Sequence, residues 1–305
     1  MRANGDPPHS YEQMSDGDQS GSVRTVRTSG VIDRSRGFGV HDHVFWAYED
    51  PENLRVGVRD FLAEGLAQGQ RVCYVASGDP ETLVEDLAGI AGLAEALTRG
   101  AAQIIPLDAI YSMGTLIEPA SQVHTYAAAT QQALAAGFTG LRVAAEATPL
   151  VRDLRQLAAF ARYEHLVDQY MTSSPFSAMC AYDSSELGDD RLAQLACLHP
   201  NTNSGVPGFR LHASADVATA LGGELDPTTA PLFGLALERA DLRATDGELV
   251  IDAVAVTFMD HRNLTLLAEQ AQQANATLVL RTAWPGLQRL VEVLGMEGVR
   301  VEPLA

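Results

Sequence analysis

Six polar side chains could bind a small ligand. Five lie at or near the ends of three apolar runs, and the sixth follows an expected helix at 189–198. The runs are "HVFWAYE", "GLRVAAEA" and "FSAMCAYD", which have the length and composition of buried strands. Open parallel sheets bind their ligands at strand ends. We therefore predict a ligand pocket at these side chains. They are His43, Glu146, Cys180, Tyr182, Asp183 and His199.

A metal site is an alternative for part of this set. Cys197 and His199 form a C-x-H pair that Cys180 could join, but no C-x-x-C or H-x-x-x-H spacing is present. We therefore predict no metal and no cofactor. For Cys180 and the aromatic residues of "HVFWAYE", a plain role in the core stays open, because free thiols and aromatic rings are common in protein interiors.

A second set of polar residues surrounds "VTFMDHRNL", where an apolar run ends at Asp260 and a helix begins. Asp260 has the side chain of a helix N-cap, and His261 and Arg262 follow it in the first turn. Two interpretations stay open. The stretch is either a capped helix with a solvated first turn or the edge of a docking surface for a partner.

Asp226 and Thr257 complete the predicted partner interface. Asp226 is expected to cap a further helix that has Pro227 at its first position. Thr257 is expected within a buried strand, and Thr265 a turn into the next helix. Neither hydroxyl is therefore an obvious site of phosphorylation.

The composition excludes several classes of enzyme. The 305-residue chain contains no lysine, so a phosphate-binding P-loop, a lysine Schiff base and a catalytic lysine pair are absent. No G-x-S-x-G stretch is present. Nucleic acid is not an expected partner, because the formal net charge is −18 and phosphate contacts need basic patches.

Residues 1–38 are rich in Gly, Ser, Asp and Arg and lack apolar periodicity, so we predict a disordered tail. No apolar stretch approaches the roughly 20 residues that cross a bilayer, and no signal peptide is evident. The three cysteines lie in or beside apolar runs, which is typical of reduced, buried thiols. We therefore expect a soluble cytoplasmic protein.

Strand-like and helix-like stretches alternate from residue 41 to residue 203. This alternation predicts an α/β unit with a mainly parallel sheet and helices on both faces. On one expected helix, Tyr163, Glu164 and His165 either place a polar group inward or mark the solvent edge. Strands are expected at 43–49, 71–77, 102–108, 140–147 and 176–183. Helices are expected at 52–68, 119–137, 153–172 and 189–198, and one or two helices at 79–98.

The Pro, Asn and Gly content of "HPNTNSGVPG", residues 199–208, indicates a linker to a second, smaller α/β unit. We place the first domain at 39–203 and the second at 208–305. In the second domain, strands are expected at 209–214, 217–226, 248–260, 277–283 and 299–304, and helices after Asp226, at 261–274 and at 285–295.

The second domain resembles the STAS domain of anti-anti-sigma factors. "LGGELDPTTAPLF", "ELVIDAVAVTFMD" and "WPGLQRLVEVLGMEGVRVE" carry the resemblance in order, spacing and residue type. It implies a small sheet with helices on one side, and a binding surface at the loop and helix after "FMD". In the switching members an anti-sigma kinase phosphorylates a serine at the place of His261. His261 has no hydroxyl, so that switch cannot operate here in its usual form.

Residues 41–203 resemble MEDS, a sensory domain found fused to regulatory modules. "HDHVFWAYEDPENL", "FLAEGLAQGQRVCYVAS", "LRVAAEATPL", "YEHLVDQY" and "MCAYDSSEL" followed by "LACLHP" carry this resemblance. It implies that the domain senses small organic molecules and has a RecA-like fold without the phosphate loop. The "GDPET" stretch after the second strand agrees, since it lacks the glycine spacing and the lysine of such a loop.

The two resemblances together predict a non-enzymatic signalling regulator. The first domain would sense a small ligand or state, and the second would dock an anti-sigma factor, a serine-kinase-like protein or another STAS protein in transcriptional or stress control. Two alternatives stay open. The protein is either a scaffold without a small ligand or a relic nucleotide-binding enzyme.

Overall fold

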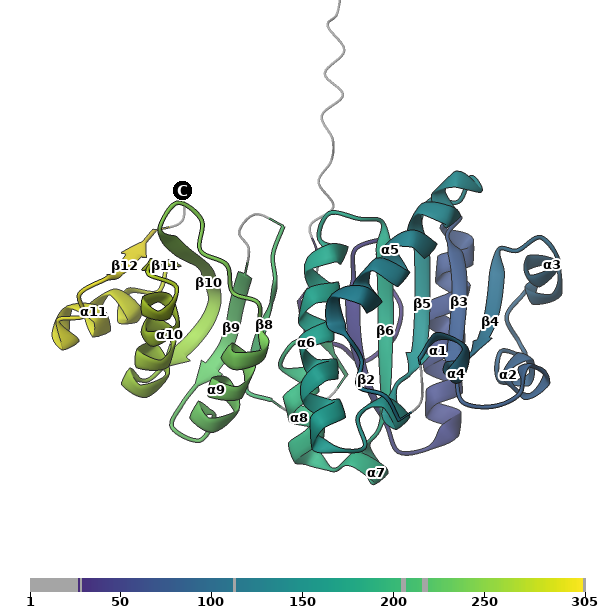
Figure 1. Cartoon of the computed structure of the whole chain (residues 1–305), viewed down its shortest axis with the longest axis horizontal. Coiled ribbons are helices and arrows are strands. Elements are labelled where there is room, and N and C mark those ends of the chain that lie inside the picture. Colours follow the sequence, from purple (N-terminus) through teal and green to yellow (C-terminus); the bar gives the residue numbers. More distant parts are fainter. Residues whose placement is uncertain (1–26, 28, 112–113, 204–206, 216–218, 304–305) are drawn as a thin grey trace, which may run out of the picture.

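The computed structural model of the chain contains two α/β units that lie side by side (Figure 1). The structure describes residues 27, 29–111, 114–203, 207–215 and 219–303. Within this part of the chain, the first unit holds a seven-stranded sheet and the second a five-stranded sheet. The predicted fold class is thereby confirmed.

The seven-stranded sheet is parallel at every described pairing. Its strands lie in the order β1-β7-β2-β6-β5-β3-β4. The central strands β2 and β6 are mostly buried, because helices cover them on both faces. The strands are β1 Gly30–Val31, β2 His43–Tyr48, β3 Arg71–Ala76, β4 Ala102–Pro106, β5 Leu141–Glu146, β6 Phe176–Asp183 and β7 Asn201–Thr202.

Helices pack on both faces of this sheet, as predicted. Helices α1, α2 and α3 share a core with one face that includes Phe61 and Tyr74. Helices α5, α6 and α8 cover the other face through a core that includes Phe45 and Phe160. The helices are α1 Pro51–Ala67, α2 Pro80–Asp86, α3 Leu93–Thr98, α4 Leu107–Ile110, α5 Pro119–Ala135, α6 Leu154–Met171, α7 Ser184–Leu187, α8 Asp189–Ala196 and the 3-10 helix η1 Thr148–Leu150.

Acidic side chains begin the three long helices of this unit. Asp50, Glu118 and Asp153 accept hydrogen bonds from free backbone N–H groups in the first turns of α1, α5 and α6. A carboxylate there satisfies those groups and lies at the positive end of the helix dipole. Pro51 and Pro119 occupy the first helical position, where no backbone N–H is needed. These caps made the helix starts predictable from the sequence.

The second sheet has the strand order β12-β11-β10-β9-β8. Strand β8 is antiparallel to β9, and the other described pairings are parallel. Gly223 in β9 has φ +95°, and a Cβ there would lie 2.2 Å from the carbonyl oxygen of Gly208. This position therefore requires glycine. The strands are β8 Phe209–Ala213, β9 Thr219–Leu225, β10 Glu248–Met259, β11 Thr277–Arg281 and β12 Val299–Glu302.

Three helices pack on one side of the second sheet, as the STAS resemblance implies (Figure 1). They are α9 Ala230–Arg239, α10 His261–Gln273 and α11 Pro285–Leu294. On the other side of β10, Val254 and Phe258 are 49% and 45% exposed. Among the described residues, no helix covers that face of β10.

Part of the predicted disordered tail is ordered. Most of the tail, residues 1–26 and 28, lies outside the described residues. Gly30 and Val31, however, pair with β7, and Phe38 is buried in the core beneath α1. The prediction of disorder up to residue 38 was therefore wrong for this stretch. A two-residue strand shows no periodicity, so the sequence could not reveal it.

The predicted linker at 199–208 was wrong at its beginning. His199, Asn201 and Thr202 are buried, and β7 pairs with both β1 and β2. The prediction also placed Pro227 at the start of a helix, but α9 begins at Ala230. Asp226 instead accepts hydrogen bonds from the backbone of the following turn. Pro, Asn and Gly mark turns of many kinds, so these residues alone did not show where the linker or α9 begins.

Candidate functional site

Six polar side chains form a cluster between the central strands and α6. His43 comes from β2, Cys180 and Tyr182 come from β6, and the others come from α6 and the end of α8. Five of the six are fully buried, and Cys180 is 6% exposed. We call this set the buried polar cluster: His43, Glu164, Asp168, Cys180, Tyr182 and His199.

Helix α6 carries two acids into the core because they occupy positions on its apolar stripe. The members of this stripe recur mostly every three or four residues. Because a helix has 3.6 residues per turn, such residues all lie on one of its faces. A buried carboxylate is unfavourable unless it is hydrogen-bonded or paired with a cation, so the partners of both acids determine what the site can do. The stripe consists of Leu157, Phe160, Ala161, Glu164, Asp168 and Met171.

Glu164 lies at the centre of the cluster. Its Oε2 atom is 3.2 Å from Nε2 of His43, 3.6 Å from Nε2 of His199 and 3.5 Å from Sγ of Cys180. Its Oε1 atom accepts a hydrogen bond from the hydroxyl of Tyr182. Sγ of Cys180 is in turn 3.7 Å from Nε2 of His43. Nitrogen, sulfur and oxygen atoms that bind protons or metals therefore surround one small volume.

His199 has a ring nitrogen without a hydrogen bond. Its Nδ1 atom lies 2.9 Å from the carbonyl oxygen of Leu195, and it donates its proton there in the neutral ring. Nε2 then carries a lone pair, is buried without a partner and faces the carboxylate of Glu164. The ring lies against His43, with 4.0 Å between the ring centroids.

Asp168 connects the cluster to the second unit. Its Oδ1 atom is 3.0 Å from Nδ1 of His43 and also accepts from the guanidinium of Arg27. Its Oδ2 atom accepts a hydrogen bond of 2.7 Å from the backbone N–H of Ala213, the last residue of β8. One buried carboxylate therefore bonds to both units and to a residue of the predicted tail.

The two histidines of the cluster differ in their pKa values. Burial lowers the pKa of His43, but its hydrogen bonds to Asp168 and Glu164 outweigh burial and raise it. Burial, and secondly the neighbouring His43, lower the pKa of His199 to about 4. His199 is therefore neutral near pH 7.

The acids and the thiol are also displaced from their usual values. Burial raises the pKa of Glu164, but His199 and His43 together outweigh it and lower the pKa. Arg27 and His43 likewise outweigh burial and hold the pKa of Asp168 well below its usual range. Burial, and secondly the charge of Glu164, raise the pKa of the Cys180 thiol well above its ordinary value. The cluster thus holds two carboxylates beside one protonated thiol.

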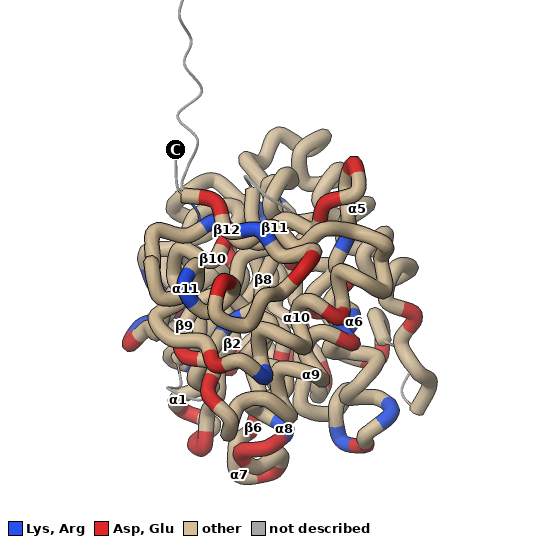
Figure 2. Tube along the Cα trace, turned by 90° about the vertical axis from the view of Figure 1, so that its left-hand side faces the viewer, with Lys and Arg blue, Asp and Glu red and all other residues tan. Residues whose placement is uncertain are grey.

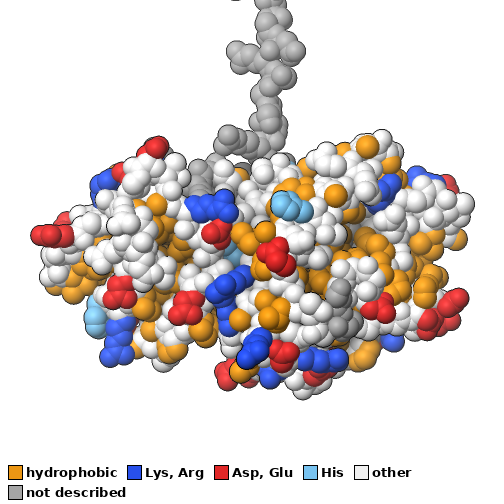
Figure 3. Space-filling view, in the orientation of Figure 1, with side chains coloured by type: hydrophobic (Ala, Val, Ile, Leu, Met, Phe, Trp, Pro, Cys, Tyr) orange, Lys and Arg blue, Asp and Glu red, His pale blue; other side chains and the backbone are white. Residues whose placement is uncertain are grey.

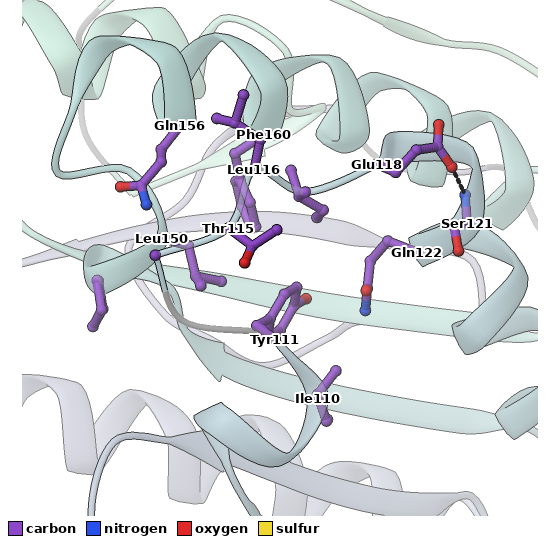
Figure 4. A pocket seen from close by; sticks show the side chains of 13 residues that line it. Ile110, Tyr111, Thr115, Leu116, Glu118, Ser121, Gln122, Leu150, Gln156 and Phe160 are labelled. Carbon is purple, nitrogen blue, oxygen red and sulfur yellow. Dashed lines mark hydrogen bonds between the residues drawn. The ribbon is translucent and has the colours of Figure 1, made fainter.

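A cavity of about 160 Å³ opens at the carboxyl ends of β4 and β5 (Figure 4). Apolar and polar side chains share its wall, and Gln122 of α5 lies in it with a buried Nε2 that has no hydrogen bond. The lining residues are Ile110, Tyr111, Gly114, Thr115, Leu116, Ile117, Glu118, Ser121, Gln122, Pro149, Leu150, Gln156 and Phe160.

Aromatic side chains lie between this cavity and the buried polar cluster. Tyr111 lines the cavity, and its hydroxyl is 3.2 Å from that of Tyr126. The ring of Phe160, also a lining residue, lies 5.2 Å from the ring of Tyr163, which directly precedes Glu164. Phe160 at the cavity therefore contacts the residue that precedes Glu164 of the cluster in α6.

The turn from β2 to α1 shows why a nucleotide is unsuited to this sheet. Asp50 caps α1 with its own carboxylate, and Glu49 and Glu52 flank it. A phosphate at this helix start would meet negative charge and an N–H group that is already bonded. The "GDPET" stretch, where the sequence lacks a phosphate loop, lies at the turn from β3 to α2, and there Asp79 likewise caps the helix by accepting from the N–H of Thr82.

Four of the six predicted ligand-binding residues come together. His43, Cys180, Tyr182 and His199 all belong to the buried polar cluster. Glu146 lies apart and accepts hydrogen bonds from Tyr48 and Thr148. Asp183 also lies apart, since it caps α7.

Sequence reasoning left open that Glu164 faces inward, which the structure confirms, but did not name it as a site residue, and it missed Asp168 and its partner Arg27. The two acids stand four residues apart at apolar positions of a helix. A carboxylate in an apolar stripe is a signal of a buried polar site, and it was available in the sequence. Arg27 gave no such signal, because its contact spans 141 residues of chain.

The predicted partner interface is divided between exposed and structural residues. His261 and Arg262 are exposed in the first turn of α10. Asp260 caps that helix, and Asn263 bridges it to the backbone oxygen of Asp226. Thr265 is exposed on the helix, as expected. Thr257 was predicted to be buried, but it is exposed because two bulges shift the register of β10.

Comparison with protein families assigns the two units. Residues 42–200, just over half of the chain, match the model of the MEDS domain, described as "MEthanogen/methylotroph, DcmR Sensory domain". The chain belongs to the MEDS family. Residues 211–303 match the model described as "Mlab, STAS domain". No curated protein matches the chain. A MEDS domain followed by a STAS domain is a regulatory architecture, which supports a role in signalling.

Charged residues of both signs lie on this MEDS–STAS protein. Acidic and basic residues are interspersed in the view from the STAS side (Figure 2) and over the helices in Figure 3. The full chain has 39 acidic and 21 basic residues. No helix of the described residues has both the length and the apolar character to span a bilayer.

Proposed function

We propose that the MEDS domain binds a small neutral organic molecule and that the STAS domain conveys the bound state to a regulatory protein. The cavity with the unpaired Nε2 of Gln122 is the observation that carries this proposal. A buried amide N–H without a partner is unfavourable, and a ligand with an acceptor oxygen would satisfy it.

The cavity limits the size and polarity of this ligand. An engineered protein cavity of about 150 Å³ holds benzene, so a cavity of about 160 Å³ fits a compact molecule. The one carboxylate in the lining, Glu118, already caps α5 by accepting from Ser121. A neutral alcohol, ketone or amide therefore fits better than an ion.

Helix α6 offers the path from the cavity to the STAS domain. Gln156 and Phe160 line the cavity, and Asp168, three turns further along, bonds to Ala213 of β8. Gln169 of the same helix donates to the backbone oxygen of Asp241 after α9. A ligand that shifts α6 would therefore alter contacts made directly by the STAS domain.

Ligand binding is tested by thermal unfolding of the full chain with a panel of small alcohols, ketones and amides. A ligand at 100 times its Kd stabilises the folded state by about 2.7 kcal/mol. Gln122→Leu should remove most of this stabilisation, whereas Gln132→Leu, exposed on the same helix, should keep it. If no compound in the panel raises the melting temperature, the scaffold function is favoured.

The docking surface that we propose on the STAS domain is centred on His261 and Arg262, with Asp260 holding the helix start. Since no hydroxyl follows Asp260, docking would not be switched by phosphorylation at that place. The partner class is an anti-sigma factor, a serine-kinase-like protein or another STAS protein. Exposed Phe258 adds an apolar contact beside these polar residues.

Incubation of the chain with anti-sigma kinases and ATP tests this surface. We expect a complex and no phosphate on the chain. Arg262→Glu should weaken the complex, while Arg289→Glu, exposed on α11, should leave it unchanged. Stoichiometric phosphate within residues 257–265 would overturn the proposal, and ATP hydrolysis by the chain alone would favour the relic enzyme.

A further inference from the structure

Four side chains of the buried polar cluster are of the kinds that bind transition metals. They are the imidazoles of His43 and His199, the thiol of Cys180 and the carboxylate of Glu164. All four are buried, and their ligand atoms lie within 4.8 Å of one another. They come from β2, β6, α6 and the end of α8, so the fold brings them together from distant parts of the chain.

We propose that these four residues bind one divalent transition-metal ion of the zinc type, in a closed tetrahedral site. The ligands would be Nε2 of His43, Oε2 of Glu164, Sγ of Cys180 and Nε2 of His199. Zinc accepts nitrogen, sulfur and oxygen ligands together and imposes no preference against such a mixture.

Four of the six distances between the ligand atoms are close to the edges of a tetrahedral site, and the other two are at most 4.8 Å. With metal–ligand bonds of 2.0–2.3 Å, the edges of a tetrahedral site measure about 3.3–3.8 Å. The four edges given by the structure are 3.2, 3.6, 3.5 and 3.7 Å. The ligands thus surround a space that suits a zinc ion with little movement.

His199 supplies an independent observation. Its Nδ1 proton is bonded to Leu195, so Nε2 presents its lone pair, and Nε2 is buried with no hydrogen bond. This lone pair faces an oxygen of Glu164 at 3.6 Å. A cation between the two atoms would convert a repulsive contact into two bonds.

The surrounding residues orient the ligands in the way that known metal sites do. Nδ1 of His43 lies 3.0 Å from Oδ1 of Asp168 and keeps its proton there, while any proton on Nε2, which faces Glu164, would leave as the metal binds. The hydroxyl of Tyr182 donates to Oε1 of Glu164 and leaves Oε2 for the metal. Binding would displace the proton of the Cys180 thiol, which leaves the protein as the thiolate–metal bond forms.

Four protein ligands leave no open position for a substrate, so the site would be structural or regulatory. Because all ligands are buried, the ion would enter during folding and leave slowly. Asp168 bonds to His43 on one side and to Ala213 of the STAS domain on the other. Occupancy of the site would therefore be sensed where the two domains meet.

The first test is metal analysis of the full chain, produced without a histidine tag in zinc-replete medium. We expect close to one zinc ion per chain. Cys180→Ala and His199→Ala should lose at least nine-tenths of it. Cys197→Ala is the matched control, since Cys197 is a buried thiol outside the cluster, and it should keep its zinc.

The second test does not depend on the folding of a variant. The wild-type chain is unfolded, freed of metal with a chelator and refolded with Co²⁺. We expect the intense visible bands of tetrahedral cobalt and a thiolate-to-cobalt charge-transfer band. An octahedral spectrum, no binding of either metal, or full retention of zinc by a folded Cys180→Ala variant would overturn the proposal.

Discussion

At the scale of single residues, Asp168 links three parts of the structure. It accepts hydrogen bonds from His43, Arg27 and the backbone of Ala213. Its side chain is fully buried, and that of Arg27 is 8% exposed. Removing one member of a buried ion pair leaves the other charged without compensation, which is more damaging than losing an exposed pair.

We predict that Asp168→Asn lowers the free energy of unfolding by about 3–5 kcal/mol. The amide has the shape of the carboxylate but leaves the guanidinium of Arg27 unpaired. Urea unfolding followed by circular dichroism measures the change. Asp190→Asn, exposed in the first turn of α8, is the control and should stay within about 0.5 kcal/mol of the wild type. A similar effect of both variants would contradict the role of Asp168.

Glu146 gives a residue-scale prediction with a pH dependence. Burial raises its pKa, and the hydrogen bonds from Thr148 and Tyr48 only partly oppose this. Its charged form is therefore disfavoured in the folded state, and the wild type gains stability as pH falls through the raised folded pKa towards the unfolded value. Glu146→Gln should be at least as stable as the wild type at pH 7.

The melting temperatures of the wild type and Glu146→Gln, measured from pH 7 to pH 4, test this sign. The advantage of the variant should shrink as the pH falls. An advantage that grows towards pH 4 would show that the carboxylate is stabilised by its partners rather than penalised by burial. Glu186→Gln is a comparison in which the pKa shift has the opposite direction. The hydrogen bond from Arg152 chiefly holds the pKa of that exposed acid below its usual range.

At the scale of elements, periodicity and caps predicted most of the long helices and strands. Helix α6 was expected at 153–172 and spans Leu154–Met171, because Asp153 marks its start. The short elements β1, β7, α4 and α7 were missed, since two to four residues hold no period. Four of the six cluster residues were predicted, whereas Glu164 and Asp168 were not, because their direction depends on the face that α6 turns towards the sheet.

Buried Arg142 shows a further limit of sequence reasoning. In the strand run "GLRVAAEA" it looks like a solvent-facing residue, yet its side chain is fully buried. Its guanidinium donates to Gln70, to the backbone oxygens of Phe61 and Phe38, and to Glu64. These partners come from three other segments of the chain, so no local sequence pattern predicts them.

The pairing of β8 with β9 supplies an element-scale prediction. Gly223→Ala should be severely destabilising, because φ is +95° and the new Cβ would lie 2.2 Å from the backbone oxygen of Gly208. Gly234→Ala is the matched change in α9, where a Cβ meets nothing within 4 Å. It should stabilise the protein by about 0.4–1 kcal/mol. Thermal unfolding of both variants measures the contrast, and equal effects would refute the need for glycine at 223.

At the scale of the whole molecule, the two domains share one apolar core. Residues of α6, β8 and α9 belong to the same buried cluster. Polar contacts add to it: the N–H of Leu211 donates to the carbonyl of Cys197 at 2.7 Å, and Arg239 donates to Gln194. Domains joined in this way are expected to lose their structure together, because opening the interface would expose apolar surface and unpaired buried groups.

The chain offers two natural probes for this prediction, since its two tryptophans lie in different domains. Trp46 is in β2 of the MEDS domain and Trp284 caps α11 of the STAS domain. Trp284→Phe leaves a probe of the first domain, and Trp46→Phe leaves a probe of the second. In each variant, we expect tryptophan fluorescence and far-ultraviolet circular dichroism to give the same urea midpoint. Dichroism follows both domains, so a fluorescence midpoint that departs from it would show independent unfolding and would remove the structural basis for signalling between the domains.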